Sequence, residues 1–174
     1  MWRFNLGAIL FLVSLTSHAQ IYKAELIANG LTCSMCSNAT YSQLKTISFL
    51  DSISTDVEHA KFVLYFHPTS PFDLRIIKSK VEDAGFSVGS LVLFTDLENL
   101  AVESGTHHTF GEVTYHFIDT KKQILQKAQG IKVIDKGFVT EKEYKKYLKM
   151  SSKDACYKTG KMENVKYLYH VTVL

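Results

Sequence analysis

The stretch IYKAELIANGLTCSMCSN, residues 21–38, sets the start of the fold. Apolar and polar residues alternate over residues 21–29, which is typical of a half-buried β-strand. Residues 30–38 hold a glycine, two cysteines and small polar side chains, so we expect a loop there. Ser37 or Asn38 can cap a helix that follows. The order therefore predicts a strand, a cysteine-bearing loop and a helix.

The rest of the first half continues this alternation of elements. Helical spacing of Ala39, Leu44 and Ile47 predicts a helix over residues 39–47. Apolar and β-branched residues predict strands within residues 49–60 and over residues 61–67. A second helix is expected over residues 72–86, with Asp73 near its start and Gly85 at its end, and a last strand over residues 87–94. Strand, helix, strand, strand, helix, strand is the ferredoxin-like βαββαβ plan of an α+β protein.

The second half of the chain has a different character. Residues 98–108 look like a linker, and the alternation over residues 111–119 predicts a strand. Short β runs are expected within residues 121–139 and a closing strand over residues 165–174. Thr140 and Glu143 form the capping-box pattern of a short helix. We predict two domains, a ferredoxin-like domain over residues 20–95 and a β-rich domain of unknown role over residues 96–174.

The first 19 residues resemble a secretory leader. Arg3 precedes a short apolar run over residues 6–15, and Ser17 and Ala19 stand at the −3 and −1 positions of a cut before Gln20. We expect a signal peptide over residues 1–19 and an exported, periplasmic or secreted mature protein; the alternative is an uncleaved membrane anchor. No other segment is apolar over the roughly 20 residues that a membrane helix needs, so no membrane association is expected after cleavage.

Composition and motifs narrow the class of function. The net charge of +3 is too small to indicate a nucleic-acid partner. The sequence contains no Gly-x-Ser-x-Gly, His-Glu-x-x-His or phosphate-binding loop pattern. We therefore expect a protein that is not an enzyme and does not bind nucleic acid.

The cysteine loop resembles that of a known family. Residues 30–36, Gly-Leu-Thr-Cys-Ser-Met-Cys, are similar to the Gly-Met-Thr-Cys-x-x-Cys pattern of the heavy-metal-associated family. That family includes copper chaperones, the metal-binding domains of copper-pumping ATPases and exported mercury-binding proteins. Residues 81–86, ending in Ala-Gly-Phe, resemble the turn after the family's second helix. The resemblance covers the first half of the mature chain and implies that Cys33 and Cys36 are metal ligands; Leu31 replaces the family's methionine.

The chemistry of the two cysteines agrees with this implication. Soft thiolates favour Cu(I) and other soft ions over hard cations, and a helix N-terminus lowers a thiol pKa. Two sulfurs suit Cu(I) or Hg(II), whereas Zn(II) usually takes four ligands. The sequence predicts a carrier or store of Cu(I), with Hg(II) or Zn(II) as alternative ions and a metal-donor or metal-acceptor protein as partner. Met35 is either a third soft ligand or an exposed apolar residue.

Two other interpretations of the cysteine pair stay open. Export favours disulfides, so Cys33 and Cys36 could form a structural disulfide in an interaction module whose function lies in the second half. A thiol–disulfide exchange site is the third interpretation, although the surrounding order of elements is not that of thioredoxin.

Other soft or titratable residues give weaker signals. Cys156 lies six residues from both Met150 and Met162, which is either a second copper site or a spare thiol among methionines that fill space. His107 and His108, with His116 close in sequence, could bind a metal or be surface histidines. His59 and His67 flank the third predicted strand without an evident ligand partner, and His170 is expected to hydrogen-bond within the core.

Overall fold

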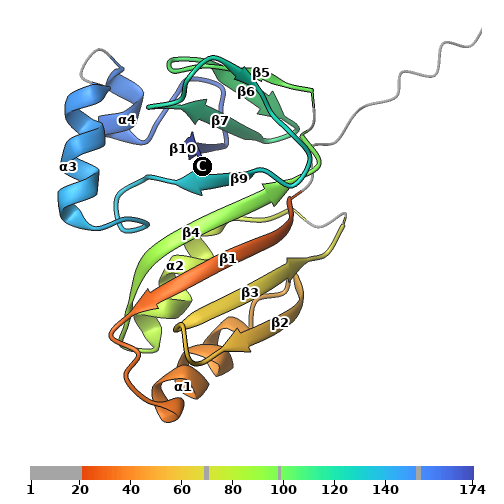
Figure 1. Cartoon of the computed structure of the whole chain (residues 1–174), viewed down its shortest axis with the longest axis vertical. Coiled ribbons are helices and arrows are strands. Elements are labelled where there is room, and N and C mark those ends of the chain that lie inside the picture. The colour runs from red at the N-terminus through yellow and green to blue at the C-terminus, as the bar shows by residue number, and fades with distance from the viewer. Residues whose placement is uncertain (1–20, 69–70, 98, 152–153) are drawn as a thin grey trace, which may run out of the picture.

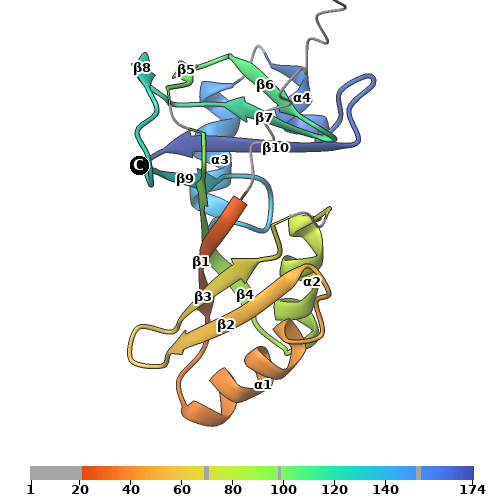
Figure 2. The ribbon, with the colours of Figure 1, turned by 90° about the vertical axis from the view of Figure 1, so that its right-hand side faces the viewer.

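The computed structural model describes residues 21–68, 71–97, 99–151 and 154–174. The predicted leader, residues 1–19, lies outside the described residues. Eight strands form one sheet in the order β2-β3-β1-β4-β9-β10-β7-β6, and β5 and β8 form a separate ribbon (Figures 1 and 2). Among the helices of the described residues, none has both the length and the hydrophobicity of a membrane-spanning helix.

The first half has the predicted ferredoxin-like arrangement. Its elements are β1 (Ile21–Asn29), α1 (Ser34–Leu44), β2 (Leu50–Asp56), β3 (Lys61–Phe66), α2 (Leu74–Asp83) and β4 (Ser87–Thr95). The strand order is β2-β3-β1-β4, and each neighbouring pair is antiparallel. Both helices lie on the same face of the sheet (Figure 2). The α+β, βαββαβ prediction is therefore confirmed.

The core of this half is built from alternate residues of the strands and from the stripe of apolar residues along one face of α2. Ala24, Leu26 and Ala28 of β1 are buried, as are the three apolar residues predicted for α2, Leu74, Ile77 and Val81. Asp73 caps α2 by accepting a hydrogen bond from the backbone N–H of Arg75. The 3.6-residue period of that stripe explains why its prediction succeeded.

Helix α1 differs from its prediction. It begins at Ser34 rather than after Asn38, and Cys33 is its N-cap residue, with extended backbone angles and no side-chain capping bond. The predicted start relied on the side chain of Ser37 or Asn38 as a cap, whereas the observed start has no side-chain capping hydrogen bond. The buried face consists of Ser37, Thr40 and Leu44, whereas Ala39 is exposed.

The second half contains more regular structure than the sequence indicates. Its elements are β5 (Ala101–Val102), β6 (His107–Phe110), β7 (Val113–Phe117), β8 (Gln123–Ile124), β9 (Gly130–Val133), α3 (Glu141–Met150), α4 (Ala155–Thr159) and β10 (Tyr167–Val173). The prediction of a linker over residues 98–108 is wrong, because β5 lies within this range and β6 begins in it. The Thr140–Glu143 capping box is present at the start of α3, but the single predicted helix is accompanied by a second, α4.

Strand β4 carries the sheet from the first half into the second. Residues 92–94 of β4 pair antiparallel with residues 130–132 of β9, and β10, β7 and β6 follow. One cluster of buried apolar side chains includes residues from both halves. The domain boundary between residues 95 and 96 stays a prediction, and the sheet runs across it.

The strand predicted within residues 111–119 is present as β7, and this strand is buried on both faces. Tyr115 and Phe117 join the main apolar cluster, whereas His116 contacts Cys156 of α4. A smaller cluster beside α3 and α4 includes Ile134, Tyr147 and Tyr157. A strand covered on both sides is expected to lose the period-2 contrast in burial.

Candidate metal sites

The two cysteines of the first half meet at the start of α1. Cys33 is the N-cap residue, and Cys36 is the third residue of the helix. Their Sγ atoms lie 3.0 Å apart, as a thiol–thiol hydrogen bond, and both cysteines are free. Cys33 is exposed and Cys36 is half-buried. The predicted pair is therefore together and open to solvent, although Cys36 lies within the helix rather than in a loop.

The surroundings of Cys33 favour its thiolate. The hydrogen bond from the Cys36 thiol, followed by one from the Cys36 backbone N–H, lowers the pKa of Cys33 below the ordinary thiol value. The N-terminus of α1 adds the positive end of a helix dipole at the same place. Because the thiolate is the form that binds metals, this geometry lowers the cost of removing the proton.

The residues around the pair hold the loop in place. Gly30 has φ +88°, which L side chains rarely adopt, and a Cβ there would lie 3.5 Å from the ring of Phe86. Phe86 and Leu31 both pack against the core, so leucine serves at that position as an apolar packing residue. Met35 is 80% exposed, in agreement with the exposed-residue alternative.

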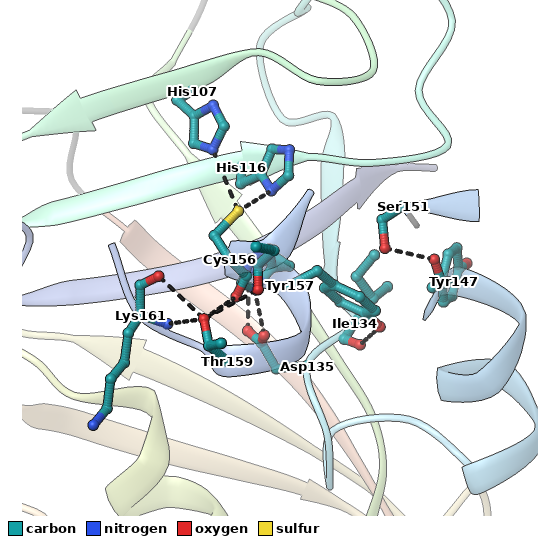
Figure 3. A network of polar contacts seen from close by, with 12 residues as sticks. His107, His116, Ile134, Asp135, Tyr147, Ser151, Cys156, Tyr157, Thr159 and Lys161 are labelled. Carbon is teal, nitrogen blue, oxygen red and sulfur yellow. Dashed lines mark hydrogen bonds and ion pairs between the residues drawn. The ribbon is translucent and has the colours of Figure 1, made fainter. Parts of the chain in front are cut away.

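A second group of soft ligands lies in the other half. His107 of β6, His116 of β7 and Cys156 of α4 place one ligand atom each within 4.8 Å of one another. The Sγ of Cys156 lies 3.4 Å from Nδ1 of His116 and 3.8 Å from Nε2 of His107 (Figure 3). In the sequence, His107 was a candidate with His116, and Cys156 with Met150 and Met162, but no pattern joined the three residues. Only the pairing of β6 with β7 and the position of α4 join them.

Burial sets the protonation states in this group. Burial, and then the charges of His107 and His170, lower the pKa of His116 to about 3, so its imidazole is neutral at neutral pH. Burial also lowers the pKa of His107. The pKa of Cys156 is raised by burial and by the charge of Asp154, so a metal must displace the thiol proton.

The other histidines predicted as candidates have different surroundings. His108 packs edge-on against Phe117, His59 is hydrogen-bonded to Asp56, and His67 lies 3.8 Å from Asp51. His170 is buried, and its Nδ1 lies 2.6 Å from Asp135, as expected for a core hydrogen bond.

Met150 and Met162, which flank Cys156 in the sequence, are about half exposed and line two different hollows. Met150 lies beside Asp154 in one hollow, and Met162 lines the other together with Tyr157. Cys156 lines neither of these hollows. The sulfur of Cys156 instead contacts imidazole rings.

Comparison with known proteins finds similarity in structure only. No family profile and no curated protein sequence matches the chain. A copper-binding domain from HMA7, a P-type ATPase, is similar with 27% identity and a TM-score of 0.34, over 38% of this chain and 88% of that domain. The CopZ metallochaperone is similar with 23% identity and a TM-score of 0.35, over 38% of this chain and 97% of that one. The yeast copper transporter domain Ccc2A is similar with 23% identity and a TM-score of 0.34, over 37% of this chain and 88% of that domain. The N-terminal part of the chain is thus similar to heavy-metal-associated domains.

Proposed function

We propose that this chain binds a soft metal ion, Cu(I), through the Sγ atoms of Cys33 and Cys36. The observation that carries the proposal is the 3.0 Å approach of two free, solvent-accessible thiols at the first turn of a helix. Thiolates are the ligands that Cu(I) prefers, and a pair of them suits its low coordination number. Hg(II) would fit the same pair, whereas Zn(II) would need further ligands to complete its usual four.

The exposure of the pair suits transfer of the ion as well as its storage. A site with two thiolates at the surface leaves room for thiols of a second protein to attack the ion. We infer that the chain carries or sequesters Cu(I) without enzymatic turnover, and that a metal-donor or metal-acceptor protein is its partner. From the leader-like residues 1–19 we also propose that this activity lies outside the cytoplasm, in the periplasm or in the secreted protein.

The test is an anaerobic titration of Cu(I) into the reduced chain from residue 20 onward, in competition with a colorimetric chelator. The Cys156→Ser variant is the starting protein, so that only Cys33 and Cys36 can supply thiolates. We expect one equivalent to bind tightly, and the binding to be lost in the additional Cys33→Ser, Cys36→Ser variant. Met35→Ala is the matched control and should leave the affinity unchanged, because Met35 is exposed. An affinity that survives loss of both cysteines would refute the assignment.

A closed Cys33–Cys36 disulfide in an interaction module is the competing function. The same short distance between the sulfurs favours it in an oxidising compartment. Thiol counting on protein taken from its own compartment separates the two. Two reactive thiols from this pair support the metal site, and a persistent disulfide without metal supports the interaction module.

A further inference from the structure

We propose a second metal site, for a divalent ion of the Zn²⁺ class, at His107, His116 and Cys156. Asp154 acts behind His116 as a positioning residue. The site differs from the cysteine pair in its ligands, in its place in the fold and in the ion that it favours. The proposal does not depend on the function proposed for Cys33 and Cys36.

The first observation is the register of two strands. His107 and His116 are direct partners in the antiparallel pairing of β6 with β7, so their side chains project from the same face of the sheet. Their rings lie 4.0 Å apart between centroids. Two imidazoles are thereby held side by side although nine positions separate them in the chain.

The second observation is the thiol that reaches them. Cys156 comes from α4, and its Sγ lies 3.4 Å and 3.8 Å from one nitrogen of each ring (Figure 3). A tetrahedral zinc ion, with bonds of about 2.3 Å to sulfur and about 2.0 Å to nitrogen, separates these ligand atoms by roughly 3.6 Å. The two sulfur–nitrogen distances are therefore already close to the spacing that the ion requires, and all three ligand atoms lie within 4.8 Å of one another. Solvent can supply a fourth ligand, because His107 is exposed.

The third observation concerns the far side of the His116 ring. His116 is 0% exposed, and its Nε2 has no hydrogen-bond partner among the described residues. The Oδ2 atom of Asp154 lies 3.7 Å from this nitrogen. A carboxylate behind a ligand histidine is the usual outer shell of a zinc site, because it holds the proton on one nitrogen and leaves the other for the metal. At 3.7 Å the Asp154 carboxylate does not hydrogen-bond to Nε2, but its negative charge on this side of the ring favours the proton on Nε2 and leaves the lone pair of Nδ1 for a metal beside Cys156.

One side chain must move when the ion binds. The two imidazole rings are stacked, with 11° between their planes, whereas a metal lies close to the plane of each ring that binds it. His116 is enclosed and packs edge-on against His170, so it cannot turn readily. The exposed ring of His107 can turn about its side-chain bonds. Binding should therefore reorient His107 and leave His116 in place.

The ligand set indicates the class of ion. Two imidazoles and one thiolate suit Zn²⁺ and its neighbours, whereas a pair of thiolates suits Cu(I). Helices α1 and α4 lie toward opposite ends of the molecule in both views (Figures 1 and 2), so one ion cannot bridge the two sites. The chain then has two metal sites of different chemistry.

The experiment uses the Cys33→Ser, Cys36→Ser variant of the chain from residue 20 onward, which lacks the first site. Zn²⁺ is titrated against a chromophoric chelator, and Co²⁺ serves as a spectroscopic probe of sulfur ligation. We expect one equivalent to bind, with thiolate-to-cobalt charge-transfer absorption. Adding Cys156→Ser should remove that absorption, and His107→Ala should weaken Zn²⁺ binding by about 100-fold or more. Asp154→Asn should weaken it by about 10-fold to 100-fold, as outer-shell changes do.

The matched control is His108→Gln, which changes the neighbouring histidine on the opposite face of β6 and should leave Zn²⁺ affinity within about twofold. Imidazole NMR resonances of His107 and His116 should shift with Zn²⁺, while that of His108 should not. Because His107 is exposed, the His107→Ala variant tests the site without replacing a buried side chain. Absence of Zn²⁺ binding by the folded double variant, or binding unchanged by both Cys156→Ser and His107→Ala, would overturn the second site and leave the cysteine pair untouched.

Discussion

The hydroxyl group of Tyr169 donates a hydrogen bond to Oδ1 of Asp73, 2.9 Å away, across 96 positions of the chain. The same hydroxyl oxygen accepts a hydrogen bond from the backbone N–H of Leu74. Tyr169 belongs to β10 in the second half, whereas Asp73 and Leu74 form the start of α2 in the first. This buried tyrosine therefore joins the last strand to a helix of the ferredoxin-like half.

Replacing Tyr169 by phenylalanine should destabilise the whole chain. The change leaves the ring but removes one donor and one acceptor, so the backbone N–H of Leu74 loses its partner. We expect the free energy of unfolding to fall by about 1–3 kcal/mol, measured by urea denaturation. Tyr167→Phe, in the same strand, is the control: among the described residues its hydroxyl makes no hydrogen bond, so its loss should cost little. Equal effects of the two changes would contradict the role given to Tyr169.

The carboxyl group of Asp73 should make stability depend on pH in the acid range. Burial by itself would raise its pKa, but hydrogen bonds from Arg75 and Tyr169 outweigh burial and lower the pKa below the ordinary value. A lowered folded-state pKa stabilises the fold above the unfolded-state pKa of about 3.9. That contribution is lost as the pH falls through the folded-state pKa.

The measurement is the free energy of unfolding as a function of pH from about 6 down to about 2. The wild-type chain should lose stability over the lower part of this range. Asp73→Asn should be less stable at neutral pH and show a shallower acid-induced decline. Parallel curves for the two proteins would show that Asp73 does not titrate differently in the folded state.

Gly130 is placed where the two halves of the sheet meet. It pairs with Phe94 across the junction of β4 with β9, and a Cβ at this position would lie 2.9 Å from Cγ1 of Val92. Gly130→Ala should therefore destabilise the chain, and Gly130→Val should do so further, by about 1–3 kcal/mol as overpacking does. Urea denaturation measures both. Both variants should still unfold in one transition, because the apolar core spans the two halves; separate transitions would contradict a shared core.

Cys33 should react as a thiolate at a lower pH than an ordinary cysteine. The hydrogen bonds from Cys36 lower its pKa, so alkylation of Cys33 should remain fast at pH values where free cysteine reacts slowly. Cys36→Ala removes the side-chain donor and should move the midpoint of the rate–pH profile upward. The profile is measured by mass spectrometry of the alkylated peptide in a Cys156→Ser background. A midpoint unchanged by Cys36→Ala would contradict the thiol–thiol hydrogen bond.

Local patterns were enough for much of the first half. The spacing of Leu74, Ile77 and Val81 predicted α2, because a helix buries residues at a period that can be counted in the sequence. The Thr140–Glu143 capping box predicted the start of α3 for the same local reason. The start of α1 was missed because Cys33 caps it through its backbone conformation, without the side-chain bond that a sequence pattern can indicate.

The order of elements over residues 21–95 and the position of Cys33 and Cys36 beside a helix start could be read from the sequence, since both depend on neighbours a few positions apart. The three-dimensional packing of the chain set the pairing of β9 with β4 and covered β7 on both faces. It also decided that Cys156 meets His107 and His116, because a strand register and the return of α4 bring together residues up to 49 positions apart. Such contacts depend on packing across the whole sheet, which no local period in the sequence records.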